Sequence, residues 1–235
     1  MKSNTTEVAN LKKKRRCTGR ITLLILAVVL LSFFVFILFP DNVEVYTSTG
    51  SISASIETLQ PEIIELNHIS VKKQPDAVTC GITAVTVMSN YYNNTDYEAN
   101  DLIAKHNSKG NTDGPELLRR ELPGRNITFK SNGLNDEMIG DIHASLKSNN
   151  PVMVYFGAPN PYNEPFYDSH GSVVYGLNLD IETITIANSY GYREEISLVA
   201  FLNRMSYTER DKYTAAQRFL WKFIGVPKNQ YIMVE

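Results

Sequence analysis

The chain has 235 residues, a formal net charge of −2, and charged side chains at 20% of its positions. At roughly 100 to 200 residues per domain, this length leaves room for one globular domain and an accessory segment. The nearly balanced charge provides no overall field that would attract a polyanion, so a nucleic-acid-binding protein is not indicated.

The N-terminal part of the chain has the pattern of a membrane anchor. The run from Ile21 to Phe39 carries no charge, and at about 1.5 Å rise per residue it reaches roughly across a bilayer core. It is preceded by a basic cluster and followed by a break; these are Lys12, Lys13, Lys14, Arg15, Arg16 and Arg20, then Pro40 and Asp41. Because Lys and Arg stay on the cytoplasmic side, the pattern predicts a cytoplasmic tail at 1–20 and a transmembrane signal anchor at 21–39. The expected location is the cell membrane, as a single-pass type II protein.

Two other interpretations of the apolar run remain open. A cleaved signal peptide has an apolar region of only about 7 to 15 residues with small residues close behind it. Here the first small-residue stretch, STGSISAS, lies well beyond the run. The second interpretation is a buried core helix, but a helix that is apolar all round beside a basic cluster is more typical of a membrane span. The uncleaved anchor is therefore favoured.

The two cysteines, Cys17 and Cys80, lie on opposite sides of this run. If the run spans the membrane, the two thiols cannot pair within one chain, and Cys80 is a lone cysteine in the exterior part. A single unpaired cysteine in that position indicates chemistry rather than a disulfide framework.

The remaining chain divides into an extracytoplasmic stalk at 40–69, with one short strand at 42–48, and a single domain at 70–235. Spacing and length predict helices at 81–92, 98–106, 115–121, 135–148, 196–205 and 215–226. Runs of β-branched and aromatic residues predict strands at 152–157, 172–179, 183–188 and 230–235, with a tight turn at 180–182. Helices first and antiparallel strands afterwards give an α+β fold class.

Cys80 lies where the first of these helices would begin, directly before Gly81. An ordinary thiol has a pKa of about 8.5, and a helix N-terminus or a neighbouring imidazolium lowers it. The sequence therefore predicts a reactive thiol with a pKa well below that value. The small Gly81 lets a substrate backbone approach closely.

A nucleophilic thiol needs a base, and four histidines are available. His68 in the stalk, His106 at a helix end and His143 within a helix are expected to be surface or capping residues. His170 follows a polar loop at the start of a strand and is the favoured base. Asn188 ends the neighbouring strand and is expected to orient the imidazole. Asp168 is a rival, but residues two apart in a strand seldom bond each other.

An oxyanion hole completes such a site, because hydrogen-bond donors must face the developing negative charge. The backbone N–H of Cys80 can supply one donor and the amide of Gln74, in an extended approach to the helix, the second. The scattered histidines show no metal-ligand spacing, and neither a metal nor an organic cofactor is implied.

These residues resemble the papain-like cysteine peptidases, in particular the bacteriocin-processing peptidases that cut after double-glycine leaders and their extracytoplasmic relatives. The resemblance runs over residues 70–207 and is carried by Gln74, Cys80-Gly81, SHGSVVYGLN and IANSYGYREEISLVAFLNRM, with NPVMVYFG echoing the family's strand before the histidine. It implies a papain-like fold, in which a buried N-terminal helix bearing Cys80 packs on an antiparallel sheet bearing His170 and Asn188. The chain departs from the family in having Asn188 where Asp is common and Ser189 where proline is usual.

The resemblance implies a membrane-anchored extracytoplasmic cysteine peptidase acting on a peptide or protein substrate through Cys80, His170 and Asn188, with Gln74 in the oxyanion hole. The loop at 157–169, with its prolines and aromatic residues, is either a cleft wall or a connecting loop with packed rings. Two other functions remain open. One is a cell-wall amidase or endopeptidase with a different third residue, and the other is a catalytically silent anchored module that binds a secreted peptide or confers immunity to one.

Overall fold

The computed structural model describes residues 25–31, 46, 62–108, 113–162, 167–209, 212–224 and 227–235. The chain divides into two compact units, one with residues 1–42 and 215–223 and a larger one with residues 43–214 and 224–235. The described part of the smaller unit is a helical segment at 25–31 and nearly all of helix α8 (Ala215–Ile224). No helix within the described ranges is both long and apolar enough to span a membrane. Most of the predicted anchor at 21–39 lies outside those ranges.

The larger unit is built on an antiparallel sheet that has seven strands in the described part of the chain. Six of them run in the order β2–β7–β3–β4–β5–β6, and β1 pairs with β4. The strands are β1 (Ile63–Glu65), β2 (Ile127–Lys130), β3 (Val152–Pro159), β4 (Tyr167–Asn178), β5 (Thr183–Asn188), β6 (Tyr192–Ser197) and β7 (Gln230–Val234). The α+β class and the antiparallel sheet expected from the sequence are confirmed.

Strand β4 organises the sheet because it is long enough to pair with three others. Its first part pairs with β3, with Gly171 opposite Tyr155, and its last part pairs with β1. Along its other edge it forms the predicted hairpin with β5, where Val173 lies opposite Ala187. The hairpin brings the N-terminal part of β4 and the C-terminal end of β5 to the same end of the sheet.

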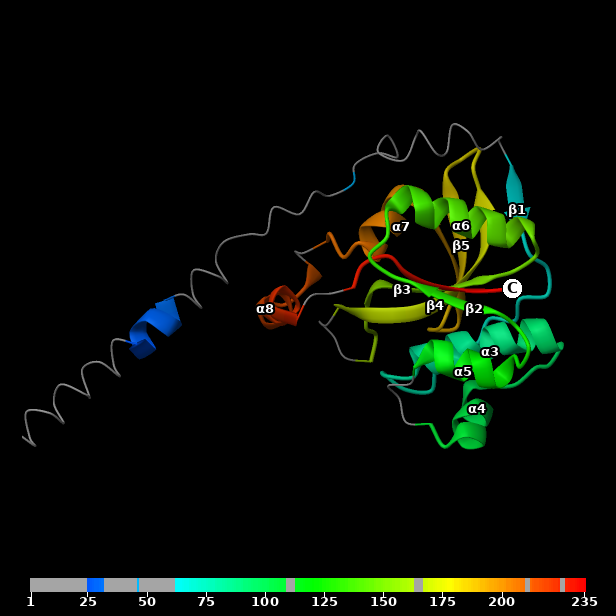
Figure 1. Cartoon of the computed structure of the whole chain (residues 1–235), viewed down its shortest axis with the longest axis horizontal. Coiled ribbons are helices and arrows are strands. Elements are labelled where there is room, and N and C mark those ends of the chain that lie inside the picture. Colours follow the sequence, from blue (N-terminus) through cyan, green and yellow to red (C-terminus); the bar gives the residue numbers. More distant parts are fainter. Residues whose placement is uncertain are drawn as a thin grey trace, which may run out of the picture. The chain divides into compact units, whose positions relative to one another are not determined.

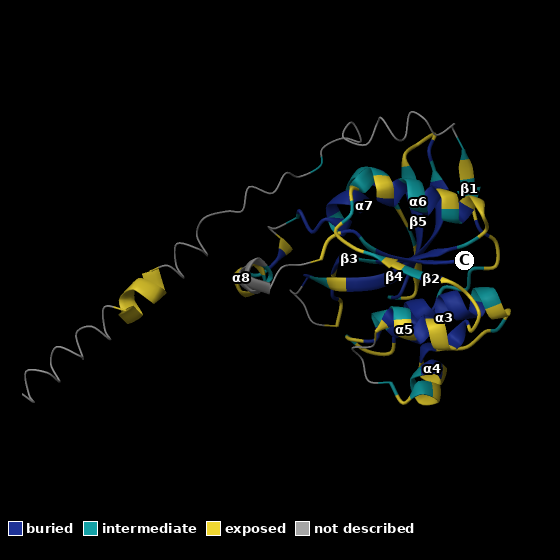
Figure 2. Ribbon diagram, viewed as in Figure 1, coloured by how far each residue is buried: buried dark blue, intermediate teal, exposed yellow. Residues whose placement is uncertain are grey.

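Helices cover both faces of this sheet (Figure 1), with α3, α4 and α5 on one side and α6 and α7 on the other. They are α3 (Cys80–Asn93), α4 (Ala99–His106), α5 (Gly114–Glu121), α6 (Asn135–Lys147) and α7 (Leu198–Met205). Helix α3 packs on β4 and is buried continuously from Ile82 to Asn90, as a helix between a sheet and outer helices must be. Figure 2 shows the buried residues concentrated in α3 and the central strands.

The structure adds three strands that the sequence did not predict. Strand β1 lies within the segment assigned to the stalk, so the sheet begins before residue 70. Strand β2 has only four residues, and β6 carries mostly exposed polar side chains, which weakens any signal from hydrophobic alternation. Of the strand predicted at 42–48, only Tyr46 lies in the described ranges, where its backbone N–H and C=O bond the amide of Asn203.

Candidate active site

Cys80 is the first residue of α3, as predicted, and lies against β4. A side-chain carbon placed on Gly171 would lie 3.2 Å from the Cα of Gly81, so glycine at both positions lets the strand and the helix start approach closely. Because Gly171 follows His170 and Gly81 follows Cys80, this contact brings the segments of the predicted nucleophile and base together.

His170 and Asn188 meet as the sequence predicted. The Nε2 atom of His170 lies 2.9 Å from Oδ1 of Asn188, and the two residues are 2% and 0% exposed. The imidazole is stacked on the ring of Tyr190, with ring centres 3.9 Å apart and an interplanar angle of 19°. The ring of Phe156 also packs on it in a T-shaped arrangement, with ring centres 5.8 Å apart. The ring is therefore held by packing as well as by one hydrogen bond.

A tight turn after Asn188 connects this pair to Gln74. The N–H of Gly191 donates to the carbonyl of Asn188 at 2.9 Å. Gly191 has a φ of 96°, and a side-chain carbon there would lie 2.8 Å from Cβ of Lys73, so the turn requires glycine. The N–H of Gln74 donates to the carbonyl of Ser189 at 2.7 Å, which fixes Gln74 beside the turn.

Ser189, where the resembled family usually has proline, has a structural reason to be serine. Its hydroxyl donates to the carbonyl of Cys80 at 3.2 Å, and its N–H donates to Oγ of Ser172 at 3.3 Å. Proline offers neither donor. Ser189 thus links the turn after Asn188 directly to the backbone of Cys80.

The side chain of Gln74 is buried, and its two polar atoms differ in their bonding. Its Nε2 donates to the carbonyl of Asp76 at 2.6 Å, whereas Oε1 is buried with no hydrogen-bond partner among the described residues. Buried polar atoms without a partner are rare in folded proteins and call for an explanation. The hydroxyl of Tyr162 donates to the backbone carbonyl of Gln74 at 2.8 Å and covers this side of the site.

The ionisation of the site differs from the sequence-based expectation. Burial raises the pKa of the Cys80 thiol, although the N–H groups of Gly171, Gly81 and Cys80 itself favour the thiolate. Burial lowers the pKa of His170 to about 4, against the opposing effects of the bond to Asn188 and the charge of Glu194. The predicted low thiol pKa is therefore wrong for this arrangement, because desolvation outweighs the helix N-terminus. In the described part of the chain, no hydrogen bond joins Cys80 to His170.

The rival residues are engaged elsewhere. Asp168 accepts a hydrogen bond from Asn160, and the exposed His68 lies in a loop. His106 and His143 are not simple surface or capping residues, since His106 contacts the carboxylate of Glu121 and His143 contacts that of Glu62.

The loop predicted at 157–169 is shorter in the structure, because β3 extends to Pro159 and β4 begins at Tyr167. Tyr162 lies near Tyr190 over the site, with ring centres 6.3 Å apart. Phe166 lies outside the described ranges. Sequence reasoning missed Tyr190 as the stacking partner of His170; its only signal was its position two residues after Asn188.

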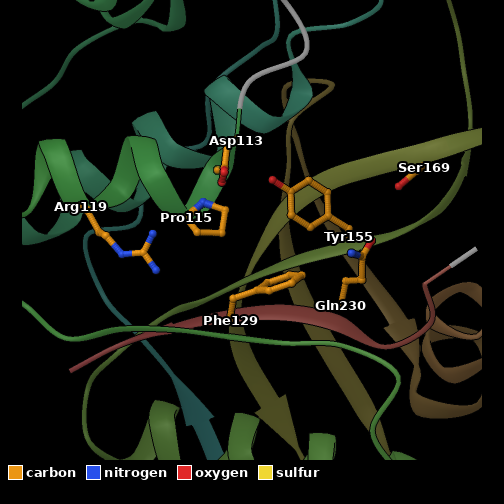
Figure 3. Close-up of a pocket in the computed structure, with 8 residues that line it drawn as sticks. Asp113, Pro115, Arg119, Phe129, Tyr155, Ser169 and Gln230 are labelled. Atoms are coloured by element: carbon orange, nitrogen blue, oxygen red, sulfur yellow. The ribbon is translucent and has the colours of Figure 1, made fainter.

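A cavity of about 510 Å³ opens beside this end of the sheet (Figure 3). It is lined by Asp113, Gly114, Pro115, Arg119, Phe129, Tyr155, Ser169 and Gln230. Ser169 is the neighbour of His170, and the ring of Tyr155 contacts the Gly171 position. The cavity therefore adjoins the segment of β4 that bears His170, through Ser169.

Among the described residues, no group of three or more His, Cys, Asp and Glu side chains is placed to hold a metal ion. No protein-family model matches the sequence, and no curated protein matches it either.

Proposed function

We propose that the chain is a membrane-anchored, extracytoplasmic cysteine peptidase of the papain-like type, with Cys80 as nucleophile and His170 as base. The observation that carries this proposal is the buried bond between Nε2 of His170 and Oδ1 of Asn188. An amide oxygen only accepts, so Nε2 carries the hydrogen and Nδ1 of the neutral ring is left as a proton acceptor. This acceptor belongs to a strand packed on the helix start that bears Cys80.

In the proposed reaction, the sulfur of Cys80 attacks a peptide carbonyl while Nδ1 of His170 accepts the thiol proton. A carbon–sulfur bond forms, the carbon–nitrogen bond breaks, and the imidazolium protonates the leaving amine. Water then attacks the thioester, transferring one proton to His170, and the acid product leaves as the thiol is restored. Asn188 holds the imidazolium by accepting its Nε2–H throughout.

The oxyanion of the tetrahedral intermediate is assigned to the N–H of Cys80 and the amide of Gln74. Gln74 Nε2 has two hydrogens, and the bond to Asp76 uses one of them. Its Oε1, which has no partner among the described residues, would accept an N–H from a bound peptide backbone only if the Gln74 side chain shifted on binding. The second hydrogen of Nε2 supports the assignment of Gln74 to the oxyanion hole.

The raised thiol pKa and the low imidazole pKa describe a resting site with both groups neutral. Neutral pairs still react when the base accepts the proton during attack, and catalytic hydrogen bonds often form only in the complex with substrate. The cavity beside Ser169, walled by Phe129, Pro115 and Tyr155, is the proposed site for a substrate side chain.

One alternative is favoured by a specific observation. The half-buried thiol, whose pKa burial raises, fits a catalytically silent anchored module that binds a secreted peptide. Turnover separates the two functions, because a binding module captures a peptide without cleaving it.

The test compares the purified full-length chain with Cys80→Ala on a peptide library, using Cys17→Ala as the matched control. The proposal predicts cleavage by the wild type and by Cys17→Ala, and none by Cys80→Ala. Peptide binding without cleavage by all three chains would support the silent module. Cleavage of peptidoglycan fragments alone would support a cell-wall hydrolase.

A further inference from the structure

A second layer of charged residues lies behind Asn188. Its Nδ2 donates to Oε2 of Glu194 at 2.7 Å and to the hydroxyl of Tyr192 at 3.3 Å. The other oxygen of Glu194, Oε1, accepts from Nη1 of Arg204 at 2.7 Å. Glu194 and Arg204 are 13% and 20% exposed, so water competes little for these bonds.

These contacts fix which way the Asn188 amide points. A carboxylate only accepts hydrogen bonds, so the atom of Asn188 that faces Glu194 must be the nitrogen. The N–H of Tyr190 donates to Oδ1 at 2.9 Å, which fixes the oxygen independently. The oxygen is thereby left facing His170, and Nε2 of the ring must carry the hydrogen.

We propose that Glu194, held by Arg204, is a positioning residue that sets the tautomer of His170 through Asn188. In this series of hydrogen bonds the donors are fixed: Arg204 donates to Glu194, Asn188 donates to Glu194, and His170 donates to Asn188. The result is an Nδ1 without hydrogen, which is the form that can accept the thiol proton. The same hydrogen bonds explain why position 188 is asparagine. An aspartate there would place two negatively charged carboxylates side by side.

The geometry predicts reciprocal rescue between positions 188 and 194. Glu194→Gln leaves a single acceptor oxygen for two donors, Asn188 and Arg204. When that oxygen faces Arg204, the new nitrogen meets the nitrogen of Asn188 and forces the Asn188 amide to rotate and turn its nitrogen toward His170. Asn188→Asp sets two acceptors against each other. In the double variant every donor again meets an acceptor, because the new amide donates to the new carboxylate and accepts from Arg204.

The experiment measures kcat/KM of the full-length chain and the ¹⁵N NMR spectrum of the His170 ring in wild type, both single variants and the double variant. Each single variant is expected to lose roughly 10²-fold in kcat/KM, mostly in kcat, the lower end of what a positioned general base contributes. The double variant is expected to return to within about fivefold of wild type, since no buried group is left unpaired. The wild-type spectrum should show hydrogen on Nε2, and Glu194→Gln should move it to Nδ1.

Glu195→Gln is the matched control, because Glu195 lies on the same strand, is 41% exposed and pairs with Arg193 instead. Losses in Glu194→Gln no larger than in this control, or a double variant worse than either single one, would overturn the proposal. Should a single variant fail to fold, a wild-type spectrum with hydrogen on Nδ1 overturns it equally.

This inference rests on the proposed function only for the activity assay. If the wild type cleaves no peptide, the proposed function fails, while the ring spectrum still decides whether Glu194 sets the tautomer.

Discussion

Two histidine clusters in the described part of the chain each contain a buried ionisable side chain but join it to different partners. In the first, His170 bonds Asn188, which bonds Glu194, which pairs with Arg204. In the second, Glu121 is contacted directly by His106, Lys105 and Ser89. The first adjoins the helix start that bears Cys80, and the second lies between α3, α4 and α5.

The two clusters differ in the group that contacts the histidine, which is a carboxylate for His106 and an amide for His170. Burial alone would raise the pKa of Glu121, but hydrogen bonds from Lys105, His106 and Ser89 outweigh it and lower that pKa. The second cluster therefore stabilises a buried negative charge and with it the packing of three helices. In the first cluster a neutral amide separates the imidazole from the carboxylate, and burial lowers the pKa of His170 to about 4, which leaves it an uncharged base. The same residue types thus stabilise the fold in one place and hold a proton acceptor in the other.

The largest expected effect tests this division directly. His170→Ala removes the base and should lower kcat/KM by roughly 10³-fold, within the range for a positioned general base. His106→Ala should leave kcat/KM of the folded protein within about twofold, because His106 touches no reacting group. Equal losses of activity in the two variants would abolish the distinction between the clusters.

Changes in the Glu121 cluster are expected to lower the stability of the protein rather than its activity. Glu121→Gln removes the carboxylate that accepts bonds from Lys105, His106 and Ser89, and should cost about 1 to 2 kcal/mol of unfolding free energy, because Glu121 is buried but Lys105 is 54% exposed and regains water. Urea denaturation of the full-length chain measures this loss, with the exposed Glu116→Gln as control. A cost below that of the control would contradict the structural role of the cluster.

The contributions of the two clusters to the stability of the protein should also be lost in different pH ranges. The pKa of His170 falls from about 6.5 unfolded to about 4 folded, so the unfolded chain binds more protons between these values and stability drops as the pH falls through them, by up to roughly 3 kcal/mol. The folded pKa of Glu121 is depressed, so its contribution is present above the ordinary glutamate value and is lost as the pH falls below it. Urea midpoints against pH for wild type, His170→Gln and Glu121→Gln separate the windows. Superimposable profiles would contradict the assignment.

A smaller effect is expected at the turn that follows Asn188. Gly191→Ala places a side chain at a φ of 96° and against Lys73, and should cost about 1 to 2 kcal/mol of stability. Because the turn positions Asn188, activity should fall as well, whereas Gly124→Ala, also at positive φ but with open space around it, should affect stability alone. Unchanged activity in a destabilised Gly191→Ala would show that the turn does not position the site.

Much of the fold could be predicted because its signals are local. The apolar run after Cys80 and the hairpin around 180–182 predicted α3 and the pairing of β4 with β5, and that hairpin accounts for the contact of His170 with Asn188. Strand β6 was missed because its exposed, charged alternation resembles a loop. Glu194 was therefore missed with it, since nothing local shows that one of several charged residues turns inward.

The ionisation of the site could not be predicted for a related reason. A helix N-terminus and a nearby histidine are visible in the sequence, and both favour a thiolate. Burial depends on the packing of segments that are distant in the sequence, such as the approach of Gly171 on β4 to Gly81 at the start of α3. In the structure, that packing decides the direction of the thiol pKa.

The most direct test of the central claim, that His170 acts on the thiol of Cys80, is the rate of Cys80 alkylation by iodoacetamide between pH 3 and 10. The full-length chain would carry Cys17→Ala so that one thiol remains. The account predicts two limbs: a plateau above about pH 4, where neutral His170 accepts the thiol proton, and a rise above the ordinary thiol pKa, where the thiolate forms. His170→Ala should remove the plateau and keep the rise. Identical profiles for the two chains would contradict the account.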